Sequence, residues 1–280
     1  MDWWQAILLG ALQGVTEFLP VSSSGHLVLA QHFLGFPDES EASGAALFFD
    51  GCLHLGTLVA VLLYLRSDLQ RQLGGQASAP ADWRSLARLG MLVALASLPA
   101  AVAVVLASDH IKESFAEPIP VAFALVALGV ILLVTNQLPR GSTSAPRTAW
   151  WQALLIGTAQ ACSAVVRGLS RSGMTIAAGL AVGLERDWAV RFSFLMSIVA
   201  NLGLGGLGIW KALQETGSQH WLTREFMLLT LAGTVTSGLV GYLTIRPLIL
   251  LVRRSRLWWF AVYLWLVGGT VLLHHFLSAA

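Results

Sequence analysis

The sequence is poor in charged residues. Only 11% of its 280 residues are Asp, Glu, Lys or Arg, against roughly 25% in an average soluble domain, whereas 56% are hydrophobic. This composition excludes an ordinary soluble enzyme. The 17 Lys and Arg stand against 15 Asp and Glu, so there is no basic excess of the kind that indicates a nucleic-acid partner.

Cysteine is also scarce. The two cysteines, Cys52 and Cys162, both lie in apolar runs without metal-ligand spacing, which argues against a disulfide framework or a cysteine-based metal site. The chain begins Met1-Asp2-Trp3-Trp4 without the basic segment of a secretory signal, so we expect the first apolar run to be retained as structure.

What the chain has is long apolar runs. A helix needs roughly 20 apolar residues to cross a bilayer, and six runs reach that length. They lie at residues 45–65, 88–107, 119–138, 189–210, 226–245 and 257–277. We therefore predict an all-α polytopic membrane protein with six transmembrane helices, in which residues 1–280 form a single domain in contact with membrane lipids.

The chain repeats one plan twice. Residues 3–13 and 150–160 match at seven of eleven positions, including a Trp-Trp-Gln start. Chance similarity between two apolar helices is the simpler interpretation, but Trp-Trp-Gln is a rare sequence. We therefore divide the domain into one repeat at 1–140 and a second at 150–280.

Each repeat opens with a segment too interrupted to be a simple span. Residues 3–19 run into a Ser- and Gly-rich break at 20–25, and residues 150–166 run into another at 167–173. Irregular backbone at membrane depth must be buried by protein or line a watery cavity. We predict two re-entrant helical hairpins. A hairpin plus three crossings ends opposite to where it began, so the second repeat is inverted, and the two breaks can meet near the midplane.

The positive residues predict the orientation. With the 66–88 loop in the cytoplasm, twelve positive residues fall on that side and three on the other. The cytoplasmic set is Arg66, Arg71, Arg84, Arg88, Arg140, Arg147, Arg186, Arg191, Arg246, Arg253, Arg254 and Arg256, and the outer set is Lys112, Lys211 and Arg224. Both termini and the acidic loop at 38–41 are then outside.

Six ionisable residues lie at the predicted membrane depth, where each charge costs at least about 2.5 kcal/mol. They are Glu17, His26, Asp50, His54, Arg167 and Arg171. Such groups are usually partnered and functional. The alternatives are ion pairs that only lock the hairpins together and, for Asp50 and His54, a helix end near water.

The first motif, residues 13–26, places Gln13 and Glu17 four residues apart on one helical face. Ser22, Ser23 and Ser24 follow, then Gly25 and His26. Serine hydroxyls and a helix start can bind an anion, and His26 is close enough in sequence to act as base or acid for Ser23. Capping of the next helix by these serines is the plainer interpretation.

The second motif, residues 167–175, joins guanidinium groups to hydroxyls in a glycine-flanked turn. Its polar residues are Arg167, Ser170, Arg171, Ser172 and Thr175. Arginine matches phosphate oxygens bidentately and stays charged when buried. Carboxylate, hydroxyl and imidazole in one motif and a phosphate cradle in the other indicate phosphoryl chemistry inside a membrane.

Over essentially its whole length the sequence resembles the bacitracin-resistance family of undecaprenyl-diphosphate phosphatases. Residues 13–26 resemble the family's first motif and residues 168–175 its second; residues 49–50, 54–57 and 192–195 also match. The resemblance implies hydrolysis of the terminal phosphate of a polyprenyl diphosphate lipid, which recycles the carrier for peptidoglycan synthesis and confers bacitracin resistance. It implies a bacterial plasma (inner) membrane enzyme whose site opens to the outer, periplasmic face, and a divalent cation, Mg²⁺ or Ca²⁺.

Two residues depart from the family pattern. Gln13 stands where a Glu is commoner, which removes one carboxylate from a metal site and predicts weaker cation binding unless Asp50 compensates. Arg167 stands where a proline is usual, and it either adds to the grip on phosphate or pairs with Glu17.

Our leading hypothesis assigns each residue a role. Glu17 and Asp50 hold the cation, Ser23 is the nucleophile or positions it, His26 moves the proton and Arg171 neutralises the transferred group. The substrate-binding set is Gln13, Ser22, Ser24, Arg167, Ser170, Ser172 and Thr175. Direct attack by water, with Ser23 only binding, fits the same residues.

Two other functions compete with hydrolysis. Broken helices in inverted repeats are typical of transporters, so the protein could instead flip the polyprenyl phosphate carrier. A lipid phosphatase of the acid-phosphatase type fails on spacing, because Ala177 stands where that pattern needs a His. The sequence is compatible with a homodimer.

Overall fold

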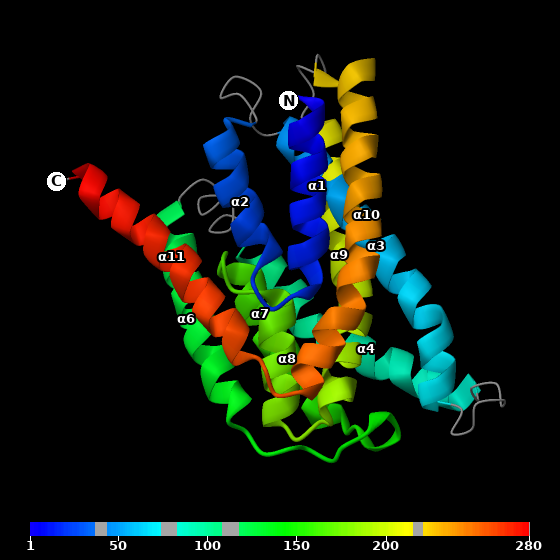
Figure 1. Cartoon of the computed structure of the whole chain (residues 1–280). Coiled ribbons are helices and arrows are strands. Elements are labelled where there is room, and N and C mark those ends of the chain that lie inside the picture. The colour runs from blue at the N-terminus through cyan, green and yellow to red at the C-terminus, as the bar shows by residue number, and fades with distance from the viewer. Residues whose placement is uncertain (37–43, 74–82, 108–117, 215–220, 280) are drawn as a thin grey trace.

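The computed structural model describes residues 1–36, 44–73, 83–107, 118–214 and 221–279 (Figure 1). These residues form ten α-helices, one short 3-10 turn at Ala145–Arg147, and no β-strand. The helices are α1 (Trp3–Phe18), α2 (Ser23–Leu34), α3 (Gly44–Leu73), α4 (Trp83–Leu106), α6 (Pro118–Asn136), α7 (Trp150–Val165), α8 (Arg171–Ala181), α9 (Arg186–Gln214), α10 (Arg224–Arg253) and α11 (Trp258–Ala279).

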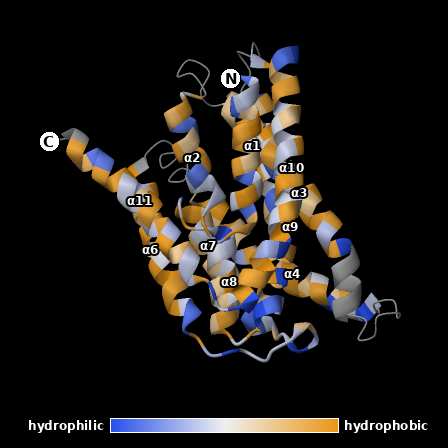
Figure 2. Ribbon diagram, in the orientation of Figure 1, coloured by the Kyte–Doolittle hydropathy of each residue, from blue (hydrophilic) through white to orange (hydrophobic). Residues whose placement is uncertain are grey.

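The six predicted spans are confirmed. Each falls in a helix that is long and apolar enough to cross a membrane, namely α3, α4, α6, α9, α10 and α11. Figure 2 shows that hydrophobic residues predominate along the described parts of these helices. Many large apolar side chains there are exposed, such as Leu106, Leu243 and Leu266, which is the surface that lipid contact requires.

Each half opens with a pair of shorter helices joined by a few residues. The α1–α2 turn covers residues 19–22 and the α7–α8 turn covers residues 166–170. The 12 residues of α2 and the 11 of α8 extend only about 18 Å or less at 1.5 Å per residue, which is too short to cross a hydrocarbon core of roughly 30 Å. In Figure 1, α1 runs inward from the N-terminus and α2 returns toward the same end of the molecule.

The glutamine of each Trp-Trp-Gln start ties the two ends of its helix pair together. Gln5 accepts a hydrogen bond from the backbone N–H of Asp2 at 2.7 Å and donates to the carbonyl of Leu34, where α2 ends, at 3.3 Å. Gln152 does the same, accepting from Ala149 at 2.8 Å and donating to Val182, just after α8, at 2.8 Å. The repeated tripeptide therefore fixes the first helix of each pair against the end of the second.

The two halves pack by exchanging partners. Helix α1 of the first half packs along α10 of the second, and α7 of the second packs along α4 of the first. Both contacts are close because glycine removes the side chain: a Cβ on Gly10 would lie 2.2 Å from the Gly233 carbonyl, and a Cβ on Gly157 would lie 2.2 Å from the Ala96 carbonyl. The main core also draws residues from both halves.

The inner end of α1 is anchored in this core. Phe18 is fully buried and packs edge-on against Phe194 of α9, with ring centroids 5.4 Å apart. The residue before Phe18 is Glu17, so the packing of one aromatic ring holds the neighbouring carboxylate in place.

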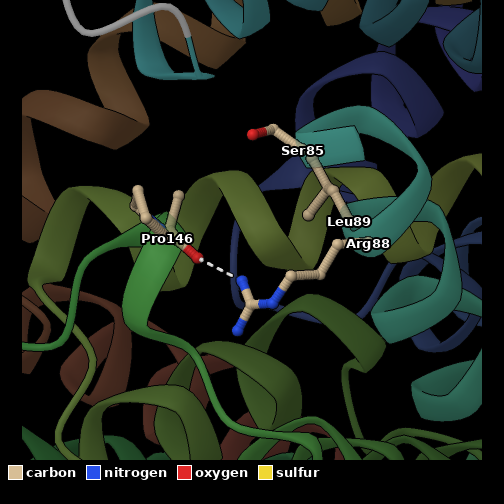
Figure 3. A pocket seen from close by; sticks show the side chains of 5 residues that line it. Ser85, Arg88, Leu89 and Pro146 are labelled. Carbon is tan, nitrogen blue, oxygen red and sulfur yellow. Dashed lines mark hydrogen bonds between the residues drawn. The ribbon is translucent and has the colours of Figure 1, made fainter. Parts of the chain in front are cut away.

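Most described arginines outside the motifs lie in the α6–α7 connection or near the ends of the helices, and Arg224 begins α10. Figure 1 shows the α6–α7 connection at the lower end of the molecule. Arg88 donates hydrogen bonds to the Ala145 and Thr148 carbonyls, at 3.5 and 2.5 Å, and lines a pocket with Ser85, Leu89 and Pro146 (Figure 3). Arg253 forms an ion pair with Asp187. The acidic loop at 38–41, Lys112 and the side chain of Arg71 lie outside the described residues.

Candidate active site

The two motifs are in direct contact. Arg171, the first residue of α8, forms an ion pair with Glu17 near the end of α1. The hydroxyl of Ser172 donates a hydrogen bond of 2.9 Å to the backbone carbonyl of Leu19, in the turn that follows α1. The sequence predicts that the two breaks can meet, and the residues at the two breaks are in contact.

Glu17 is the centre of this contact, and only 2% of its side chain is exposed. Its Oε2 accepts hydrogen bonds from the Ser23 hydroxyl at 2.8 Å and from Gln13 Nε2 at 3.0 Å. The other oxygen, Oε1, accepts from Arg171. A serine hydroxyl that already donates to a carboxylate can pass its proton to that carboxylate when it attacks.

His54 of α3 completes the surroundings of the carboxylate. Its Nδ1 lies 3.6 Å from Glu17 Oε2 and 3.1 Å from Gln13 Nε2. Asn201 of α9 interacts with the same carboxylate and donates to the Thr57 hydroxyl at 3.3 Å. Two long helices of different halves therefore close the site behind the motifs.

Three polar atoms in the site have no hydrogen-bond partner among the described residues. They are a donor, the Nη1 of Arg171, and two acceptors, the Oε1 of Gln13 and the Oδ1 of Asn201, and all three are buried. Buried polar atoms in proteins are nearly always satisfied. An open donor and an open acceptor beside the same carboxylate are what a site for an anionic ligand, or for an anion with its cation, would present.

Helices α2 and α8 both begin at this place, which directs two positive helix ends toward it. Ser22 caps α2 by accepting from the Gly25 N–H at 3.2 Å, and Ser170 caps α8 by accepting from the Gly173 N–H at 3.1 Å. The capping interpretation is thus confirmed for Ser22, whose φ of 73° is unusual for a residue with a side chain. A helix start is also a ready site for phosphate.

The other hydroxyls of the second motif are engaged with protein. Ser170 and Ser172 lie 2.9 Å apart through their Oγ atoms. Thr175 donates to the Arg171 carbonyl at 2.8 Å and lies 2.7 Å from the Ser193 hydroxyl. These bonds fix the turn that carries Arg171. Ser24, in the first turn of α2, is only partly buried.

The hydrogen bonds of the His26 ring go to groups other than Ser23, the serine with which the sequence associated it. Its Nδ1 is 2.8 Å from the Ser22 carbonyl and its Nε2 is 2.8 Å from the hydroxyl of Tyr263 on α11. The Ser23 hydroxyl points instead to Glu17. The geometry favours Glu17 as the group that takes the proton of Ser23.

Asp50 and Arg167 form a neighbouring charge group. Asp50 accepts a hydrogen bond of 2.7 Å from Gln31 Nε2 and interacts electrostatically with His54 and Arg167. The partner of Glu17 is therefore Arg171, whereas Arg167 interacts with Asp50. Asp50 and His54 lie inside α3, six and ten residues after its first residue, and not at its end.

Tyr263, Asn201 and a role for His54 were missing from the sequence-predicted site. His54 carried a signal, because it is ionisable and lies in an apolar run. Tyr263 and Asn201 lie far from both motifs in the sequence, and tertiary packing alone brings them in.

No group of three His, Cys, Asp or Glu residues within the described ranges is arranged to hold a metal ion. Mg²⁺ is commonly held by one or two carboxylates together with substrate phosphates. The buried Oε1 of Gln13 lacks a donor and Glu17 supplies a carboxylate beside it, so these residues fit a cation that the substrate helps to bind.

The chain is similar to known proteins over nearly its whole length. Residues 6–270 match the family described as bacitracin resistance protein BacA. An undecaprenyl-diphosphatase of Rubrobacter xylanophilus is 42% identical over 97% of both chains, and one of Alcanivorax borkumensis is 39% identical over 97% of this chain and 98% of that one. An undecaprenyl-diphosphatase of Carboxydothermus hydrogenoformans is 32% identical over 97% of each.

Proposed function

This chain belongs to the bacitracin resistance protein BacA family, and we propose on that basis that it is an undecaprenyl-diphosphatase. It is a multi-pass membrane enzyme that hydrolyses undecaprenyl diphosphate to undecaprenyl phosphate and inorganic phosphate. This activity fits a role in cell-wall synthesis and bacitracin resistance. The relatives named above are all diphosphatases, and nothing supports the alternative of a lipid flippase.

One contact supports the assignment of catalytic roles most directly: the Ser23 hydroxyl donates to a Glu17 carboxylate that Arg171 also binds. In our proposal, Ser23 Oγ forms a bond to the terminal phosphorus while the bond from that phosphorus to the bridging oxygen breaks. Glu17 takes the serine proton, and undecaprenyl phosphate leaves. Water then attacks the phosphorus of the phosphoserine while His26 takes a proton from that water. The bond from phosphorus to Ser23 Oγ breaks, Glu17 returns its proton to the serine oxygen, and phosphate leaves.

The substrate-binding roles follow from the turn geometry. The unpartnered Nη1 of Arg171 would donate to oxygens of the transferred phosphoryl group, where positive charge stabilises the transition state. The starts of α2 and α8 would add backbone N–H groups, from the turns that hold Ser22, Ser24, Ser170 and Ser172. Thr175 would support this turn, and Arg167 would extend the positive charge toward Asp50.

We propose that Glu17 and Gln13 bind Mg²⁺ or Ca²⁺ together with the diphosphate, and that Asp50 adds negative charge nearby. Such a cation neutralises phosphate oxygens and orients the leaving group. The support is the unpartnered Oε1 of Gln13 beside the Glu17 carboxylate.

We also propose that the two halves form an inverted repeat with two re-entrant hairpins. Three observations support this: α2 and α8 are too short to span, each glutamine joins the start of its hairpin to its end, and the halves exchange the packing partners of α1 and α7. The excess of arginines near the α6–α7 connection supports a cytoplasmic location for it, and in that orientation the site would open to the outer face of the bacterial plasma membrane. A homodimer stays a prediction.

Labelling of single cysteines tests the orientation. In a chain with Cys52 and Cys162 replaced by Ser, Glu225→Cys at the start of α10 and Ser142→Cys before the 3-10 turn are both exposed positions. A membrane-impermeant maleimide should label Glu225→Cys in intact cells and Ser142→Cys only after permeabilisation. The reverse pattern would overturn the orientation.

Phosphate release and trapping of the intermediate test the function. The purified protein should release phosphate from undecaprenyl diphosphate in the presence of Mg²⁺ or Ca²⁺. Quenching with substrate labelled in the terminal phosphate should leave the label on Ser23. Release of phosphate without any trapped label, in the wild type and in variants slow in the second step, would favour direct attack by water.

A further inference from the structure

The hydroxyl of Tyr263 and the ring of His26 form a hydrogen-bonded contact to which the proposed reaction assigns no role. Tyr263 Oη lies 2.8 Å from His26 Nε2, and the two rings are nearly parallel, with an interplanar angle of 9° and centroids 5.6 Å apart. The residues are 237 positions apart, on α2 and α11. The last helix of the chain thus reaches the first motif.

The backbone of the α1–α2 turn fixes the protonation of the other ring nitrogen. His26 Nδ1 lies 2.8 Å from the Ser22 carbonyl, which can only accept, so Nδ1 carries the hydrogen. Ser22 is itself held by its cap on Gly25. In the neutral ring, Nε2 then carries no hydrogen and accepts a hydrogen bond from the Tyr263 hydroxyl.

The neutral ring can take up a proton only at Nε2. The Tyr263 hydroxyl is the hydrogen-bond partner of that atom among the described residues, and His26 is 7% exposed. Without the hydroxyl, the ring keeps its bond to Ser22 and loses the contact that sets the direction of Nε2. The usual orienting partner of a catalytic histidine binds the nitrogen that does not transfer the proton, which here is Nδ1 with the Ser22 carbonyl. The Tyr263 hydroxyl holds Nε2 itself, so it must move aside, or pass a proton on, when the ring takes one up.

We propose that Tyr263 is a positioning residue that holds His26 in the neutral, Nδ1-protonated form with Nε2 in a fixed direction. The inference rests on the proposed function, in which His26 moves a proton. Tyr263 is 42% exposed, at the edge of the site, and its ring supports the His26 ring by stacking. It acts on turnover through His26 and does not bind the diphosphate.

The substitution Tyr263→Phe is a sharp test because it keeps the stacked ring and removes one oxygen. Its matched control is Tyr242→Phe on α10, where the tyrosine is 47% exposed and packs edge-on against Tyr64. Tyr263→Phe should lower kcat roughly tenfold and leave KM unchanged, a smaller loss than the roughly 100-fold or more expected when the acid or base itself is removed, because His26 is retained. Tyr242→Phe should leave both constants unchanged.

A double-mutant cycle separates positioning from a structural effect. In a His26→Ala background, Tyr263→Phe should lower kcat by less than about twofold, because residues that act as a unit are not additive. An equal loss in both backgrounds, or a Tyr263→Phe enzyme as active as the Tyr242→Phe control, would overturn the proposal.

Nitrogen NMR of histidine-labelled protein tests the contact without any turnover. The His26 Nε2 signal should shift in Tyr263→Phe and stay in place in Tyr242→Phe. If the wild type is inactive but the His26 Nε2 signal still shifts in Tyr263→Phe, the proposed function is overturned and the pairing of Tyr263 with His26 is retained. An active wild type whose Nε2 signal is the same with and without the hydroxyl would overturn the role of Tyr263 alone.

Discussion

Arg171 and Glu17 form an ion pair across 154 positions of sequence. One residue begins α8 and the other lies next to the end of α1, so each adjoins the turn of a different half. Neither turn alone holds a carboxylate, a nucleophile and a guanidinium. The candidate active site therefore exists only when the two helix pairs are docked.

Arg171→Lys separates the two functions of this guanidinium. A lysine keeps the positive charge beside Glu17 but has no second planar nitrogen to replace the unpartnered Nη1. We expect activity to fall by roughly 100-fold, in the range seen when a single transition-state donor is lost. The melting temperature should fall less than in Arg171→Ala, which leaves Glu17 buried and unpaired. Equal activity of the lysine variant and wild type would contradict the proposed role of the second guanidinium nitrogen, Nη1.

Gln13→Glu tests the cation proposal. A second carboxylate four residues before Glu17 adds ligand charge for a hard cation. The Mg²⁺ or Ca²⁺ concentration that gives half-maximal activity should fall by roughly an order of magnitude. An unchanged cation requirement would mean that Gln13 lies outside the cation site.

Gly157→Ala tests the exchanged packing of the halves. Its Cβ would lie 2.2 Å from the Ala96 carbonyl, whereas a Cβ on Gly206 of α9 meets nothing within 4 Å. We expect Gly157→Ala to destabilise the fold by about 1–3 kcal/mol through overpacking. Gly206→Ala should be neutral or stabilising by up to about 1 kcal/mol, because alanine favours a helix. Thermal unfolding in detergent gives the comparison, and equal melting temperatures would contradict it.

The two glutamine ties should differ in strength. Gln152 donates to Val182 at 2.8 Å and is buried, whereas Gln5 donates to Leu34 at 3.3 Å and is only partly buried. Each glutamine bonds two backbone groups, but Gln152 does so from the more buried position. Gln152→Ala should therefore lower the free energy of unfolding by about 1–3 kcal/mol, and Gln5→Ala should lower it by less. The same unfolding assay tests this order, and a larger loss for Gln5→Ala would reverse the interpretation.

The large features of the fold were predictable because they depend on local composition. Apolar length alone located the six spans, and the repeated Trp-Trp-Gln located both helix pairs. The sequence also named both members of the Glu17–Arg171 pair, because charges in apolar runs need partners.

The detailed contacts were not predictable because they depend on tertiary geometry. His26 follows Ser23 by three positions, a spacing that favours contact on a helix. Ser22, whose φ is positive, instead accepts a hydrogen bond from His26 Nδ1 through its carbonyl. Tyr263, near the other end of the sequence, bonds the second ring nitrogen, and the Ser23 hydroxyl donates to Glu17.

The central claim is that the two turns form one phosphatase site, and phosphate release by paired variants tests it most directly. Glu17→Gln changes the end of α1 beside the first turn and Arg171→Ala changes the start of α8 beside the second, while Glu185→Gln, an exposed position before α9, serves as the control. With undecaprenyl diphosphate and a divalent cation, wild type and Glu185→Gln should release phosphate at the same rate, and each turn variant should lose at least about 100-fold. Combining the two changes should add little further loss. Full activity in either turn variant, with the protein folded, would contradict a shared site.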